Sequence, residues 1–334
     1  MKKLIVGIAC VAITFMASSV MAAENWYDMV KLNGLIWADA YYKTADADDG
    51  RDGDKSDIDV ARMQFAAGIQ VHPQVSGYIR YRWDNDDVGL YLEDAYITLT
   101  GKENMPLYLI AGRQYIPFGN YTNHFITDPT TFILGNTNDG AAVAGYRFSE
   151  GLLDASLGLF SGGIQDAGDQ DTIDSFVASV KSTPIEGLDL MLSFTSNLSS
   201  SETLHPILEL NPDPSVVGGW HLFARYLLVE RLTFIGEFVG ATGEYDAGEL
   251  AAEDRQPIAW NTEVGYMIND AWTVAARYGG SKDGGDLFPK NEFGIVANWG
   301  IFTNTNFLVE YMHGTYQDIV DKEDTITARL SLVF

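Results

Sequence analysis

Apolar and polar residues alternate with a period of two along most of this chain. The clearest stretch is 187–196, where one face holds Leu188, Leu190, Leu192 and Phe194 and the other holds Asp189, Met191, Ser193 and Thr195. Residues 271–278 and 325–334 repeat the pattern, and no long apolar stripe follows the helical period. A period of two indicates strands with two chemically different faces. The sequence therefore predicts an all-β protein.

Counting every such segment gives about sixteen strands, joined by connections that alternate in length. The strands are expected near 28–42, 57–71, 75–83, 90–100, 106–115, 140–148, 152–160, 173–181, 187–196, 218–228, 231–240, 258–267, 271–279, 291–300, 304–313 and 325–334. Short turns alternate with long polar loops at 43–57, 161–172, 197–217, 241–257, 279–290 and 314–323. An even number of antiparallel strands places both chain ends on one side.

Three features favour a transmembrane barrel over a soluble β-protein, which also alternates. The apolar faces carry almost no charge, short turns alternate with long loops, and aromatic residues lie at segment ends, as at Trp83, Trp220, Trp260, Trp272 and Trp299. Such rings favour the headgroup level of a bilayer. Open sheet edges do not occur in lipid, so the sheet is expected to close into an antiparallel barrel. The terminal Phe334 is typical of bacterial outer-membrane barrels.

The N-terminus has the features of a secretory signal. Lys2 and Lys3 precede an apolar stretch, and small residues around Ala22 provide a cleavage site. We expect residues 1–22 to be a cleaved signal peptide and residues 23–334 to form a single outer-membrane β-barrel domain. The expected location is the outer membrane of a Gram-negative bacterium, with periplasmic termini and with lipid and lipopolysaccharide as partners.

Composition narrows the function further. The formal net charge of −25 excludes nucleic acid as a partner, because binding phosphates requires a basic surface. The hydrophobic content of 46% argues against intrinsic disorder. The single cysteine, Cys10, lies in the expected signal peptide, so a disulfide scaffold is excluded.

If the apolar faces meet lipid, the polar faces line the lumen. The second to sixth strands then supply a basic wall of Arg62, Arg80, Arg82, Arg113 and Arg147. The other charges expected to line the pore are Arg225, Arg277, Arg329, Asp154, Asp189, Glu237, Glu263 and Glu310. A basic wall facing a largely acidic one would create a transverse field that discriminates polar solutes. Alternatively, these charges form ion pairs that hold a packed interior.

The connection at 116–139 is too apolar for a solvated loop. Six of its side chains are large and apolar and need to be shielded from water: Phe118, Phe125, Ile126, Phe132, Ile133 and Leu134. We interpret it as a loop folded into the lumen after the fifth strand, in the position of the constriction loop of sixteen-stranded porins; a contact with another protomer is the alternative. The expected constriction residues are Pro117, Phe118, Gly119, Tyr121, His124, Asp128 and Pro129.

The sequence lacks local signatures of catalysis and of metal binding. No Gly-x-Ser-x-Gly or His-Glu-x-x-His motif occurs, and the five histidines are scattered. The aspartates of 43–57 lack the spacing of an EF-hand, so we interpret them as a solvated loop, with loose divalent-cation binding near lipopolysaccharide as the alternative. A hydrolase pair formed only in space would be His124 with Asp128. We expect no enzyme, no metal site and no cofactor.

The stretch Gly112-Arg113-Gln114-Tyr115-Ile116-Pro117-Phe118-Gly119, followed by Asp128-Pro129 and Leu134-Gly135, resembles the LbtU family of siderophore porins. Its Gly-x-x-x-x-Pro-Phe element is also similar to that of phosphate-selective porins. The resemblance implies uptake of a ferric siderophore across the outer membrane.

The residues and the resemblance together predict a porin for passive, plug-free uptake of a small, anionic solute such as a ferric siderophore. A chain of this length cannot supply the 22 strands and the plug of energy-coupled siderophore receptors. A general diffusion porin, a phosphate- or anion-selective porin, and a non-conducting structural or adhesin barrel are the alternatives. Homotrimer assembly stays open, because no sequence feature decides it.

Overall fold

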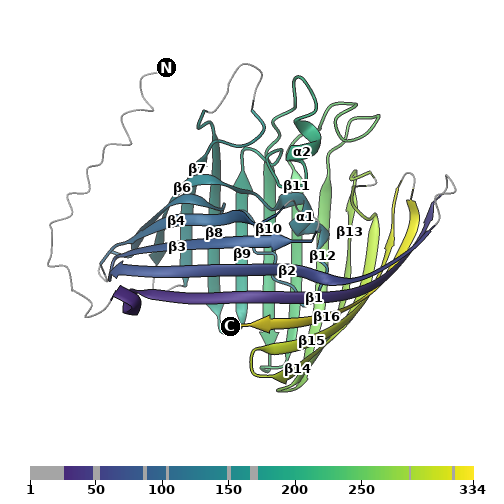
Figure 1. Cartoon of the computed structure of the whole chain (residues 1–334). Helices are drawn as coiled ribbons and strands as arrows, with labels where there is room; N and C mark the ends of the chain where they lie inside the picture. The colour runs from purple at the N-terminus through teal and green to yellow at the C-terminus, as the bar shows by residue number, and fades with distance from the viewer. Residues whose placement is uncertain are drawn as a thin grey trace.

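A closed barrel of sixteen antiparallel strands makes up the protein (Figure 1). The computed structural model describes residues 26–47, 53–85, 89–102, 105–148, 152–165, 172–285, 287–317 and 320–334. Each strand pairs with its neighbours in sequence, and β1 pairs with β16 to close the sheet. The predicted fold class and strand number are therefore confirmed. The expected signal peptide lies outside the described residues.

The strand bounds follow the predicted segments closely. The strands are β1 Val30–Ala47, β2 Gly53–His72, β3 Val75–Asp84, β4 Tyr91–Thr100, β5 Leu107–Tyr115, β6 Asn138–Phe148, β7 Leu153–Phe160, β8 Ser175–Ile185, β9 Leu188–Thr195, β10 Gly219–Leu228, β11 Leu232–Ala241, β12 Ile258–Asn269, β13 Trp272–Lys282, β14 Asn291–Phe302, β15 Thr305–Thr315 and β16 Val320–Val333. Three short helices complete the elements: η1 Trp26–Met29, α1 Thr130–Gly135 and α2 His205–Leu208.

The two faces of the sheet differ in exposure as the alternation predicts. On β9, the exposed fractions of Leu190 and Leu192 are 38% and 57%, whereas those of Met191 between them and of Ser193 are only 2% and 3%. Large apolar side chains on the other strands, such as Ile97 and Ile295, are likewise exposed on the outside. A row of exposed apolar residues around a closed barrel is the surface that a bilayer requires. No helix in the described part of the chain is long and apolar enough to cross a membrane.

The connections separate by length to the two ends of the barrel. Short turns and the C-terminus lie at one end, and the longer connections, with α2, lie at the other (Figure 1). Two of the predicted loops, 43–57 and 314–323, are mostly strand instead. The ladder between β1 and β2 continues to Ala45 opposite Gly53, so backbone pairing extends into the acidic segment. Asp48, Asp49 and Asp52 lie outside the described residues.

The interior of the barrel is packed on one side rather than evenly lined. The largest apolar cluster joins the connection between β5 and β6 to strands β6–β8, β11 and β12 and to the loop that follows β9. Leu198, Leu204 and Leu208 of that second loop, residues 196–218, are fully buried in this cluster. The sequence describes 197–217 only as a long polar loop; the structure adds that its leucines are covered inside the barrel.

Candidate functional site: the constriction loop and the lumenal wall

The connection between β5 and β6, residues 116–137, folds into the lumen, as predicted; we call it the constriction loop. Its helix α1 packs against β11, β12 and β13 on the far side of the barrel (Figure 1). Ile116, Phe118 and Leu134 are exposed at 5%, 2% and 0%. Burying apolar side chains of this size stabilises the docked loop by roughly 1.5–3 kcal/mol each.

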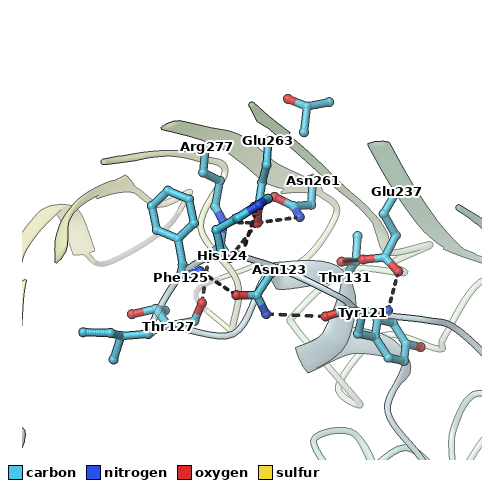
Figure 2. Close-up of polar contacts among 12 residues, drawn as sticks. Tyr121, Asn123, His124, Phe125, Thr127, Thr131, Glu237, Asn261, Glu263 and Arg277 are labelled. Carbon is cyan, nitrogen blue, oxygen red and sulfur yellow. Dashed lines mark hydrogen bonds and ion pairs between the residues drawn. The ribbon is translucent and has the colours of Figure 1, made fainter. Parts of the chain in front are cut away.

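Carboxylates from the far wall hold the backbone of this loop (Figure 2). On β11, Glu237 accepts a hydrogen bond from the Tyr121 amide at 3.1 Å and another from the Thr131 hydroxyl. The Nε2 atom of His221 lies 2.8 Å from the same carboxylate. Glu237 and His221 are both fully buried, so the carboxylate has exchanged water for these partners. Buried polar groups in folded proteins are paired in this way.

Glu263 on β12 holds the next part of the constriction loop (Figure 2). Its Oε2 atom lies 2.9 Å from both the backbone nitrogen and the Nδ1 atom of His124. Its Oε1 atom accepts hydrogen bonds from Nε and Nη2 of Arg277 at 3.0 and 2.9 Å. Arg277 also donates to the Thr127 carbonyl at 2.8 Å and stacks 4.2 Å from the centre of the Phe125 ring. Loop and wall thus form one charge-compensated network.

Glu310 on β15 completes the attachment. It accepts hydrogen bonds from the Ile126 amide at 2.5 Å, from the Thr127 amide at 3.1 Å and from the Thr127 hydroxyl at 2.6 Å. Like Glu237 and Glu263, it is almost completely buried, at 1% exposure. The predicted acidic wall therefore points inward, but the loop covers these three carboxylates. They fasten the loop instead of facing an open channel.

Two glycines create the space in which the loop lies. A Cβ added at Gly265 would lie 2.5 Å from Nε2 of His124, a ring that Glu263 holds in place. Gly119 has a φ of 96°, in the left-handed region that favours glycine, and its amide donates to the Ser193 hydroxyl at 3.3 Å. The backbone turn at Pro117–Gly119 and the docked histidine both depend on the absence of a side chain.

The opposite wall carries the predicted arginines, but each of the first three is paired. Arg62 lies 2.6 Å from Asp84, Arg80 lies 2.8 Å from Glu93, and Arg82 lies 2.7 Å from Glu93. Arg80 also pairs with Asp94, and Arg82 with Asp84. Sequence reasoning missed these three carboxylates. The wall is therefore a lattice of charges of both signs and not a purely basic surface.

A β-bulge explains why period-two counting missed two of these acids. Arg80 is opposite Asp94, but Tyr81 is opposite Leu92, so Glu93 is an extra residue on β4. A bulge lets two successive side chains point to the same face. Glu93 and Asp94 are accordingly both buried, at 4%. The buried oxygens of Glu93 also accept a hydrogen bond from the Tyr115 hydroxyl at 2.8 Å.

Apart from Arg113, the remaining predicted pore charges form ion pairs with nearby residues. The distances between partners are 3.3 Å for Arg147 and Asp154, 3.1 Å for Arg225 and Asp189, and 2.8 and 2.7 Å for the two bonds between Arg329 and Asp39. Arg113 is exposed and forms no ion pair within the described residues. Seven of the eight arginines predicted to line the pore therefore form ion pairs, as the second interpretation of the sequence expects.

Asp128 is the loop residue that faces the arginine-bearing wall. Its partial burial raises the pKa of the carboxyl, and the nearby guanidinium groups of Arg62 and Arg277 oppose this shift. The next residue, Pro129, is the N-cap residue of α1. Glu202 of loop 196–218 behaves similarly: burial raises its pKa, and it accepts a hydrogen bond from the Asn136 side chain at 2.6 Å. Burial thus raises the pKa of both carboxyls above that of an exposed acid.

The hydrolase pair that the sequence allowed does not form. His124 contacts Glu263 and not Asp128. Among the described residues, no group of three or more histidine, cysteine or acidic side chains could hold a metal ion.

No family model matches the chain, so the resemblance to the LbtU family stays an expectation. A UPF0422 protein of Coxiella burnetii is 25% identical over 279 residues, which cover 77% of this chain and 59% of that protein. A UPF0422 protein of Legionella pneumophila is 24% identical over 100 residues, or 27% of this chain and 19% of that one. The chain thus spans less than two thirds of the length of these relatives.

Solved structures show the fold more fully. The outer-membrane channel DcaP of Acinetobacter baumannii superposes with a TM-score of 0.67 at 15% identity, covering 91% of this chain and 97% of its own. OmpF of Salmonella typhi, solved with daunomycin, gives 0.61 at 14% identity, covering 93% and 100%. OmpT of Vibrio cholerae in a trimer form gives 0.57 at 11%, covering 92% and 100%. The protein shares the porin fold.

Proposed function

We propose that this protein is an outer-membrane porin through which small polar solutes diffuse passively. One observation carries the proposal: the constriction loop is fastened across a closed sixteen-strand barrel by buried carboxylates of the far wall. A barrel of this size without such a loop would enclose a wide aqueous channel. The loop narrows the lumen at a fixed place and leaves a charged wall opposite, which is the arrangement that sieves solutes by size and polarity.

The membrane setting is part of the same proposal. The exposed apolar band would meet lipid and the outer leaflet's lipopolysaccharide, with the short-turn end and both termini in the periplasm. Assembly as a homotrimer is compatible with the trimer form in which OmpT of Vibrio cholerae was solved. The expected cleavage after residue 22 belongs to this proposal as well.

A second candidate is selectivity for an anionic solute, including the ferric siderophore that the resemblance implies. The observation that favours it is the order of the charges at the wall. The side chains of Arg62, Arg80 and Arg82 are exposed at 21%, 25% and 16%, whereas those of Glu93 and Asp94 are exposed at 4% and 5% and that of Asp84 at 15%. A passing solute would therefore meet the guanidinium groups before the carboxylates of Glu93 and Asp94, with Asp84 as the one comparably exposed acid of this group. Guanidinium binds carboxylates through two parallel hydrogen bonds.

Single-channel conductance in planar bilayers tests both candidates. Stepwise ion conductance by the wild-type protein is expected, and its absence from correctly inserted protein would refute the porin. Under a salt gradient, the reversal potential of Arg80→Ala/Arg82→Ala should indicate lower anion selectivity than that of the wild type, because the variant leaves the carboxylates of Glu93 and Asp94 without their arginine partners. The control is Lys282→Ala, an exposed cation with 72% exposure. An unchanged reversal potential, or no block by a ferric carboxylate siderophore, would leave a general porin.

A further inference from the structure

A cavity of about 600 Å³ lies beneath the constriction loop, toward the short-turn end of the barrel. Asn123, His124 and Phe125 of the loop form its roof, and strands β10 to β16 together with β1 form its walls. The residues of the short turn between β10 and β11, Glu230 and Arg231, lie at its rim. A solute that passes the loop would enter this space next, and its volume falls in the range of small-molecule sites.

The cavity is lined by uncharged polar residues as well as by charged ones of both signs. Carboxamides and hydroxyls come from six residues: Asn123, Asn298, Asn306, Thr233, Thr273 and Ser331. The charged residues are Arg225, Arg231, Arg329, Asp128 and Glu230. A carboxamide offers two donors and a carbonyl acceptor, and a hydroxyl both donates and accepts. Sugar hydroxyls have the same dual capacity, whereas a carboxylate ligand only accepts. The lining therefore matches a ligand that carries many hydroxyl groups.

Two of the three arginines in the lining are held by carboxylates. Arg329 makes two bonds to Asp39, at 2.8 and 2.7 Å, and Arg225 lies 3.1 Å from Asp189. The third, Arg231, lies at the rim next to the acidic Glu230. An anion would have to compete with Asp39 and Asp189 and would also meet Asp128 in the roof. A neutral solute leaves the pairs intact and meets charges of both signs, which favours it over an anion.

Apolar surface completes the site. Trp37, Phe125 and Leu308 lie among the polar groups. The guanidinium carbons of Arg329 and Arg62 are 4.0 and 4.7 Å from the centre of the Trp37 ring, which holds the indole in a fixed position. The carbon-bound hydrogens of a sugar ring form an apolar face that would pack on Leu308 and on the parts of the two aromatic rings that the guanidinium groups leave uncovered, while its hydroxyls would reach the surrounding amides.

We propose that this cavity binds a neutral polyhydroxylated solute of mono- or disaccharide size. The proposal deepens the porin function and rests on it for its physiological meaning. The cavity would hold a sugar on the short-turn side of the constriction and would raise its local concentration at the exit. It names a solute class different from the anions that the arginine wall favours.

Equilibrium binding to the detergent-solubilised full-length barrel tests the site directly. Titration calorimetry with glucose, sucrose, maltose and trehalose should give saturable binding of at least one sugar, tighter than that of citrate. Asn298→Ala/Asn306→Ala should weaken that binding about tenfold, because the variant lacks two carboxamides that would hydrogen-bond the sugar. The matched control is Thr325→Ala/Ser156→Ala, which removes lumenal hydroxyls outside the cavity. Heat-modifiable electrophoretic mobility checks that every variant is folded.

The outcomes separate this site from the porin function. Conductance without saturable binding of any of the four sugars would overturn the sugar site and leave the porin intact. Tighter binding of citrate, or equal sugar binding by the cavity variant and its control, would also overturn it. Sugar binding by a barrel that does not conduct would refute the porin and keep the site.

Discussion

Removing the Glu310 carboxylate should release the constriction loop while the barrel stays closed. The perturbation is Glu310→Ala. It deletes the acceptor of the Ile126 and Thr127 amides and of the Thr127 hydroxyl, at 2.5, 3.1 and 2.6 Å. The strand ladders of β15 with β14 and β16 use backbone atoms and are unaffected. Loop docking and barrel closure should therefore separate in this variant.

The free-energy cost of this substitution comes from the loop donors that lose their acceptor. A buried donor without a partner costs roughly 1–3 kcal/mol, and two amides lose their acceptor. Some of this cost is relieved by water that enters the space of the deleted side chain, so a value of about 3 kcal/mol is reasonable. That value lowers the ratio of docked to undocked loop about a hundredfold, at about 1.4 kcal/mol per factor of ten. Glu310→Gln keeps one acceptor oxygen and should show a smaller effect.

Single-channel recording measures the release of the loop. The Glu310→Ala channel should show higher mean conductance and more open-channel noise than the wild type, with Glu310→Gln in between. Asp154→Asn is the matched control, because this lumenal acid pairs with Arg147 and Tyr108 and does not touch the loop. A Glu310→Ala channel as narrow and quiet as the wild type would refute the idea that these carboxylates hold the loop in place.

Three further results are expected. Gly265→Ala would place a Cβ 2.5 Å from His124 and should raise open-channel noise; a quiet channel would show that the ring has room to move. Leu204→Ala removes a fully buried side chain, at a cost of about 2–5 kcal/mol. It should speed proteolysis of loop 196–218 by about thirtyfold or more, whereas unchanged cleavage would place this leucine outside the packed cluster. The pKa of Asp128 is raised above 3.8, so its contribution to stability is present below 3.8 and is lost as pH rises through the folded-state pKa. Acidification through that window removes a lumenal negative charge, so anion selectivity, read from the reversal potential, should rise in the wild type. The rise should be smaller in Asp128→Asn, in which only the other lumenal acids, such as Glu202, can be protonated.

The sequence was sufficient for the strands and for the position of the loop. A strand's side chains alternate across the sheet, so residues such as Leu190, Met191 and Leu192 record locally which face meets which surroundings. The apolar run around Phe132 to Leu134 likewise indicated that this loop needs cover, and a barrel interior is the nearest cover after the fifth strand. Leu134 is fully buried and Ile133 is partly buried against the same apolar cluster, which confirms that reasoning.

The partners of the charged residues were beyond the reach of the sequence. The bond from Ile126 to Glu310 joins residues 184 positions apart, and the bond from Tyr121 to Glu237 joins residues 116 apart. Period-two counting assigned Glu237 and Glu310 to the lumen. It could not tell an open lumen from one covered by a loop, since both give the same alternation.

The sequence by itself determined the barrel, because the alternation of apolar and polar residues and the lengths of the turns are local properties that can be read directly from the sequence. What only the tertiary structure decided is how the lumen is used. The bulge at Glu93 reverses the local parity, and loop 196–218 joins the apolar cluster beside Phe118. Both depend on the register of neighbouring strands and on which loops share the interior. Charge compensation inside a closed barrel is a property of those contacts, and no single segment of the chain contains it.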